Sequence, residues 1–113
     1  MTGIVTTENS FYMRTTLYPP EPRRLRVLFE TPSRWLTPDW QDAQHLSGDQ
    51  KLRCLWSDGT SAVTFHLAEI QPGCFRLDAS FESATAPSNI GSIANACSIA
   101  NQRFRQALEK EAA

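Results

Sequence analysis

The segment KLRCLWSDGTSAVTFHLAEIQPGCFRLDASFE, residues 51–82, contains three strand-like runs joined by two turn signals. The runs are Lys51–Ser57, Ser61–Ala68 and Cys74–Glu82, and their apolar side chains recur at every second position, as in a strand with one buried face. Asp58-Gly59 predicts a tight hairpin, because Gly accepts the positive φ of a type I′ turn. Gln71-Pro72-Gly73 predicts the second turn. The segment therefore predicts a half-buried antiparallel meander.

After Pro87 the apolar spacing changes from that of a strand to that of a helix. Ser88 or Asn89 can cap the start of a helix that runs to about Glu109. One stripe of this helix carries its apolar residues, Ile90, Ile93, Cys97, Phe104 and Leu108. We expect this long C-terminal helix to pack on one face of the sheet.

The N-terminal half gives weaker signals. Phe11–Tyr18 alternates well enough for a strand, and a proline-rich link follows it. Leu25–Glu30 then predicts a second strand, with Leu25, Val27 and Phe29 inward. A Thr-Pro-Asp sequence at residues 37–39 is typical of a helix start, which predicts a short connecting helix over Pro38–Leu46.

Together these elements predict an α+β fold: an antiparallel sheet of four to five strands, a short connecting helix and a long C-terminal helix packed on one face. The 113 residues suit one domain, over residues 11–113, preceded by a flexible segment over residues 1–10 unless a sheet captures it. The net charge of −1 gives no reason to expect a nucleic-acid or membrane partner. Without a secretory signal or an apolar run of about 20 residues, the sequence predicts a soluble, cytoplasmic protein with no membrane contact.

No pattern typical of catalysis, metal binding or cofactor binding is present, so the sequence predicts a non-enzymatic protein without a cofactor. The two histidines, His45 and His66, fit structural or surface positions, with His66 opposite to the inward Phe65. An odd number of cysteines predicts reduced thiols. Cys54 and Cys97 fall on apolar faces, whereas Cys74, beside a turn, is the most exposed candidate.

The stretch 83–102 contains no charged residue, although an exposed helix face normally carries several. Depletion of charge is typical of the centre of a protein interface. The leading hypothesis is therefore a protein-interaction or regulatory factor, acting on another protein or as a homodimer, as would suit an accessory protein of a bacterium or mobile element. The alternative is that the helix lies deep against its own sheet. The candidate partner-binding residues are Ser92, Asn95, Ala96 and Ala100.

A second hypothesis, from a different class, is binding of single-stranded nucleic acid. Guanidinium groups pair with phosphates while bases stack on exposed aromatic rings. The candidate cations are Arg14, Arg23, Arg24 and Arg26, with Tyr12, Tyr18 and Trp35 as the nearby aromatics. The alternative is an ordinary solvated strand edge, on which charges discourage aggregation.

A third hypothesis is a small-molecule pocket between the sheet and the helix. Its lining would include Trp56, Phe65 and Phe75. Aromatic residues of this kind are more often plain core.

Overall fold

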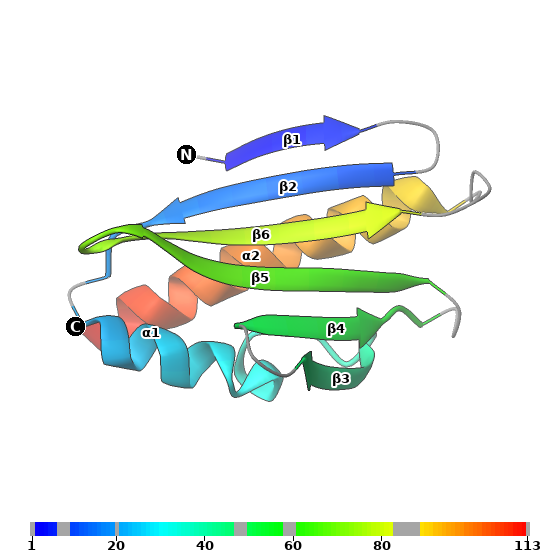
Figure 1. Cartoon of the computed structure of the whole chain (residues 1–113). Coiled ribbons are helices and arrows are strands. Elements are labelled where there is room, and N and C mark those ends of the chain that lie inside the picture. The colour runs from blue at the N-terminus through cyan, green and yellow to red at the C-terminus, as the bar shows by residue number, and fades with distance from the viewer. Residues whose placement is uncertain are drawn as a thin grey trace.

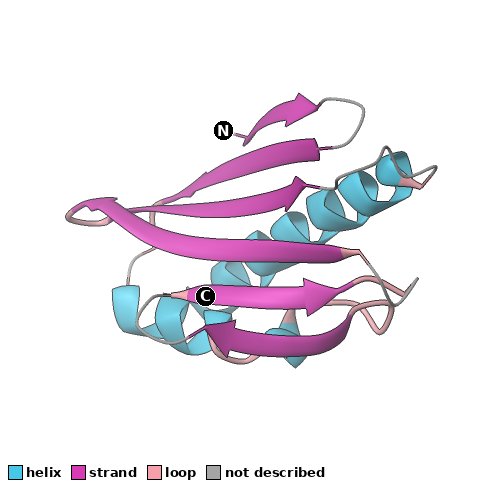
Figure 2. Ribbon diagram, turned by 45° about the vertical axis from the view of Figure 1, so that its right-hand side comes forward, coloured by secondary structure: helices cyan, strands magenta, loops and turns pink. Residues whose placement is uncertain are grey.

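The computed structural model describes residues 2–6, 10–19, 21–46, 50–57, 61–82 and 89–112. A long helix crosses one face of an antiparallel sheet, and a short helix lies at one end of the sheet (Figures 1 and 2). In chain order the elements are β1 (Thr2–Thr6), β2 (Ser10–Leu17), α1 (Pro22–Phe29), the 3-10 turn η1 (Pro32–Arg34), β3 (Gln41–Leu46), β4 (Lys51–Leu55), β5 (Ala62–Gln71), β6 (Cys74–Glu82) and α2 (Ile90–Ala112).

The expected α+β class, with its antiparallel sheet, short helix and long C-terminal helix, is confirmed. The sheet order is β1-β2-β6-β5-β4-β3. The meander is confirmed by the pairing of Leu52 with Phe65 and of Leu67 with Leu77. The Asp58-Gly59 turn lies outside the described residues, whereas Gly73 in the second turn has the positive φ, 80°, that favours glycine.

The segment Leu25–Glu30 is not a strand, so that prediction is wrong. Leu25, Leu28 and Phe29 are buried while Val27 is 56% exposed, which is the i, i+3, i+4 spacing of a helix rather than alternation. Pro22 fits the first helical turn, where its fixed φ is favourable and its missing N–H is not needed. Residues 22–29 therefore form α1, the short helix of the fold.

The predicted helix over Pro38–Leu46 is also wrong, because Gln41–Leu46 is the edge strand β3. All six of its residues are exposed, so there was no apolar alternation to detect. The pairing with β4 shifts between Gln41 and Gln44, and Asp42 has a φ of 46° at this irregularity. Such bulges are common on edge strands, where they protect the edge from further pairing.

At the opposite edge, β1 pairs with β2 from Thr2 opposite Thr15 to Thr6 opposite Phe11. This sixth strand comes from the segment that was expected to be flexible unless a sheet captured it. Pairing with β2 therefore accounts for the strand conformation of residues 2–6.

The core lies between the sheet and the two helices, and Trp35 is at its centre. Its indole packs against Phe29 of α1, Phe65 of β5 and Phe104 of α2, with ring centroids 6.0, 5.2 and 5.2 Å away. All four side chains are fully buried. One aromatic residue thus joins α1, the sheet and α2, which fixes the η1 segment against the long helix.

Candidate functional site

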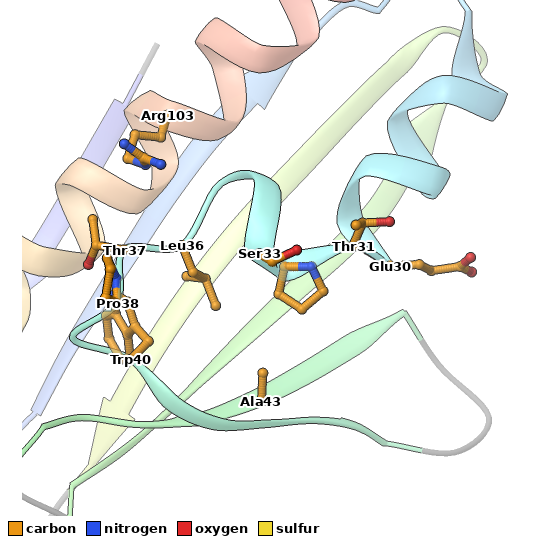
Figure 3. A pocket seen from close by; sticks show the side chains of 10 residues that line it. Glu30, Thr31, Ser33, Leu36, Thr37, Pro38, Trp40, Ala43 and Arg103 are labelled. Carbon is orange, nitrogen blue, oxygen red and sulfur yellow. The ribbon is translucent and has the colours of Figure 1, made fainter.

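A pocket of about 660 Å³ opens where the segment after α1 passes between α2 and the bulged edge strand β3. Its size falls within the range of small-molecule sites. Figure 3 shows the lining side chains, with Arg103 and Glu30 at opposite ends. The lining consists of Glu30, Thr31, Pro32, Ser33, Leu36, Thr37, Pro38, Trp40, Ala43 and Arg103.

The apolar part of this pocket rests on the core. Leu36 and Trp40 line it and are each only 8% exposed. The Trp40 ring is held edge-on by Trp56 and Phe65, with centroids 4.9 and 5.7 Å away. Because aromatic neighbours fix it on two sides, this part of the lining is already formed without a ligand.

Arg103 supplies the positive charge of the pocket. It projects from α2 and donates a hydrogen bond from Nε to the carbonyl oxygen of Trp35, over 3.0 Å. In the described part of the chain no carboxylate pairs with it, since Glu30 lies at the far end of the pocket. The bond through Nε fixes the guanidinium and leaves its Nη groups as donors for an anion.

The irregularity of β3 shapes the opposite wall. Ala43 falls inside the register shift between Gln41 and Gln44 and lines the pocket. A bulge redirects side chains relative to a regular strand, and bulges occur often beside functional sites. A small residue at this position keeps the wall of the pocket open.

The four predicted partner-binding residues of α2 divide between two environments. Ser92 and Asn95 are exposed, whereas Ala96 and Ala100 are 9% and 1% exposed and belong to the core. At Ala96 and Ala100 the small side chains are thus used in the chain's own core. The exposed, uncharged strip around Ser92 and Asn95 remains a prediction of a partner surface.

The predicted arginine cluster is not one surface. Arg14 lies on β2, whereas Arg23, Arg24 and Arg26 lie on α1 because residues 22–29 are helical. Arg24 pairs with Glu21 over 2.9 Å, and Arg26 lies 3.7 Å from Glu69 and over the Phe75 ring. Trp35, expected to be an exposed stacking partner, is fully buried. Among the predicted aromatics, Tyr18 is 73% exposed and Tyr12 is half-buried.

The thiols are core groups. Cys54 and Cys97 are buried, as expected, and burial raises the pKa of Cys54 to about 12 and also raises that of Cys97. Cys74 is the most exposed of the three, as expected, but at 6% exposure it is also buried. A hydrogen bond with the Cys74 thiol raises the pKa of Tyr18, so the phenol lies beside this cysteine at the start of β6.

His66 faces away from the core next to the buried Phe65, as expected. His45 is in β3 rather than at a helix end, and its ring lies 6.5 Å from that of Phe29. The predicted pocket aromatics Phe65 and Phe75 are buried core residues, and Trp56 supports Trp40 from the side.

Sequence reasoning missed the residues that line the observed pocket. Leu36, Trp40 and Arg103 come together only through the tertiary fold, since about sixty residues separate the first two from the third. No helix in the described residues is long and apolar enough to cross a membrane. Over the same residues, no group of three or more His, Cys, Asp or Glu side chains could hold a metal ion.

No protein-family model and no curated protein matches the chain. Solved structures that share its fold include the following two. A conserved protein of unknown function from Enterococcus faecalis aligns with a TM-score of 0.53 and 15% identity, over 93% of this chain and 75% of its own. A crystal structure of a structural-genomics target from Rhodobacter sphaeroides aligns with a TM-score of 0.54 and 14% identity, over 97% of this chain and 99% of its own. At this identity the likeness concerns the fold alone.

Proposed function

We propose that the protein is a non-enzymatic binding module that holds a small amphipathic molecule, with an apolar body and one anionic group, in the pocket beside Arg103. One observation carries the proposal: a fixed guanidinium that no carboxylate of the described residues pairs with stands at one end of a concave, largely apolar lining. A mostly apolar pocket with a few converging polar groups is the usual form of a ligand site.

The two parts of the pocket have different roles. Leu36, Pro38 and Trp40 offer apolar surface to the body of the ligand, which gains free energy by leaving water. Arg103 offers Nη donors to a carboxylate, sulfonate or phosphate, and a charge-assisted hydrogen bond is about twice as strong as a neutral one. The exposed Glu30 at the other end disfavours a second anionic group there.

The three cysteines are free, which fits a reducing compartment, so a cytoplasmic location is part of the same proposal. The proposal concerns binding, since among the described residues the lining contains no His or Cys and Glu30 is its only carboxylate.

Two fluorescent probes separate the two roles. Anilinonaphthalene sulfonate has an aromatic body and one sulfonate, and phenylnaphthylamine has a similar body without a charge. We expect both to bind saturably, with one site per chain. Arg103→Gln should weaken sulfonate binding about tenfold, the effect of one lost charge-assisted hydrogen bond, and leave the neutral probe nearly unchanged.

Arg105→Gln is the matched control. Arg105 is also on α2 and also donates to a backbone carbonyl oxygen, that of Thr16, over 3.3 Å, but it does not line the pocket. Ala43→Phe should weaken both probes because the larger side chain fills the pocket from the exposed strand β3. Equal losses in the two arginine variants, or full binding by Ala43→Phe, would overturn the proposal.

A further inference from the structure

The face of the sheet opposite α2 carries no helix in the described part of the chain (Figure 1). Its side chains come from the alternate positions of β2, β6, β5 and β4 that do not enter the core. Among the outward positions that the structure describes on these strands, four are cationic and one is acidic: Arg14, Arg76, Lys51 and Arg53, with Asp78. We call this surface the outer face.

The register aligns several of these groups in one row across the sheet. Arg14 of β2 is opposite Asp78 of β6, Asp78 is opposite His66 of β5, and His66 is opposite Lys51 of β4. Directly opposed residues on neighbouring strands have Cβ atoms about 5 Å apart. The row therefore forms a continuous band of ionisable and hydrogen-bonding side chains over four strands.

Asp78 organises the arginines instead of cancelling the positive charge. Its carboxylate is buried, and it accepts a hydrogen bond from Arg76 Nε over 2.9 Å and lies 3.6 Å from Arg14 Nε. One carboxylate thus orients two guanidinium groups, and Arg14 keeps nearly half of its side chain exposed. Arg53, in the neighbouring row, is exposed. Over the outward positions that the structure describes, the net charge is positive, although that of the chain is −1.

The outer face also carries a flat stacking surface, formed by the Tyr12 ring and the Arg14 guanidinium. The Arg14 guanidinium lies 5.5 Å from the centroid of the Tyr12 ring and donates from Nη2 to the Tyr12 hydroxyl over 3.1 Å. That hydrogen bond, followed by the nearby Asp78, raises the pKa of Arg14. Tyr18 directly follows the end of β2 and is largely exposed. Bases of single-stranded nucleic acids stack on aromatic rings and on arginine planes of this kind.

We infer that the outer face binds single-stranded nucleic acid, with its phosphates on Arg14, Arg76, Lys51 and Arg53 and its bases against the Tyr12–Arg14 stack. The charge complements a polyanion, and the stack favours one whose bases are not already paired. This site is separate from the pocket beside Arg103, which is on the α2 side of the sheet. Of the cations that the sequence singled out, only Arg14 belongs to it.

The test is a salt titration with a fluorescein-labelled oligothymidylate of about fifteen nucleotides, observed by anisotropy at about 50 to 200 mM salt. A net of three phosphate contacts predicts a slope of log affinity against log salt of about −2, so the affinity should fall about twentyfold over this range. Duplex DNA of the same length should bind more weakly, because its bases are not available for stacking.

Arg53→Glu should reduce the affinity at low salt and make the salt slope shallower. Arg23→Glu is the matched control, since it makes the same charge change at an exposed cation on α1 and should have a smaller effect. Tyr12→Leu should weaken binding at least about fivefold, the low end of the stacking range. A thermal unfolding curve for each variant separates lost binding from a lost fold.

Three outcomes would overturn the inference. The first is no binding of the oligonucleotide by the folded protein at low salt. The second is an equal loss of affinity in Arg53→Glu and Arg23→Glu, which would mean that the oligonucleotide is attracted only by the net charge of the protein. The third is stronger binding of polyglutamate than of the oligonucleotide at equal charge, which would assign the outer face to an acidic protein.

Discussion

A buried hydrogen bond between Asn101 and Thr15 ties α2 to the sheet, and its removal gives a quantitative test of the fold. The Asn101 Nδ2 group donates to the Thr15 hydroxyl over 3.0 Å, and the two residues are 3% and 2% exposed. The other amide atom, Oδ1 of Asn101, has no hydrogen-bond partner in the described structure. The amide is therefore only half satisfied, in a place where water does not reach it.

Thr15→Val removes the acceptor and keeps the shape of the side chain. Asn101 then has two unpaired buried atoms, and leaving a buried donor without its partner costs about 1–3 kcal/mol, so we expect a loss of about 2 kcal/mol. Asn101→Leu removes both amide atoms at once, while Thr15 has a further interaction of its own. Asn101→Leu should therefore cost less than about 1 kcal/mol of unfolding free energy, because no unpaired amide remains.

Urea unfolding followed by circular dichroism measures these costs, and the double variant measures the coupling between them. Once Asn101 is leucine, Thr15→Val removes only the further interaction of Thr15 and no longer leaves an amide unpaired, so its cost should be smaller and the coupling free energy should exceed about 1 kcal/mol. In a thermal scan Thr15→Val should lower Tm by roughly 8 °C for a chain of this size. The reasoning is refuted if Thr15→Val matches the wild type within about 0.5 kcal/mol, or if the two costs simply add.

Three further predictions concern the thiols, the second turn and the helix face. Burial raises the pKa of Cys54 to about 12 from 9.0, so the thiol of the unfolded chain loses its proton first as the pH rises. The free energy of unfolding should therefore fall above about pH 9, by up to about 1.4 kcal/mol per pH unit. In urea unfolding at several pH values Cys54→Ala should show a shallower fall, and a fall equal to that of the wild type would contradict this. Gly73→Ala should cost about 1 kcal/mol in the same assay and Gly73→Asn less, since a Cβ there meets no atom within 4 Å and only the positive φ is strained. If the uncharged strip of α2 is a self-association or partner surface, Ser92→Glu should lower the mass in sedimentation or the capture of a partner, with Arg23→Glu as control; an unchanged mass and unchanged capture would exclude the strip.

The meander and α2 were predictable from the sequence, because a half-buried strand and an amphipathic helix each repeat their apolar residues at a characteristic period. α1 was also readable in principle, since Leu25, Leu28 and Phe29 follow helical spacing after Pro22. The short segment matched a period of two almost as well, and Val27 was assigned to the core. Two or three apolar residues are too few to separate the periods.

β3 and the pocket could not be predicted in this way. β3 is exposed along its whole length, and its strand conformation comes from pairing with β4, which no local pattern records. The pocket depends on the packing of Leu36 and Trp40 beside Arg103, and on a bulge that brings Ala43 to its wall. The outer face is an intermediate case. The alternation of apolar and polar residues along its strands is visible in the sequence, but the row from Arg14 to Lys51 depends on strand order and register.

The two proposed sites follow from one property of this fold, a single sheet covered on one side. The inward positions of β2, β4, β5 and β6 supply the core for α1, α2 and the η1 segment. The pocket beside Arg103 lies at the rim of this core, between the η1 segment and Ala43 of β3. The outward positions have no covering element in the described residues and must be soluble, which favours polar and charged side chains there. What solubility does not require is the buried Asp78 holding two arginines in place, since burying a carboxylate costs free energy unless it is paired. This pairing holds Arg14 and Arg76 in fixed positions on the outer face, which is the arrangement that the proposed nucleic-acid contact uses.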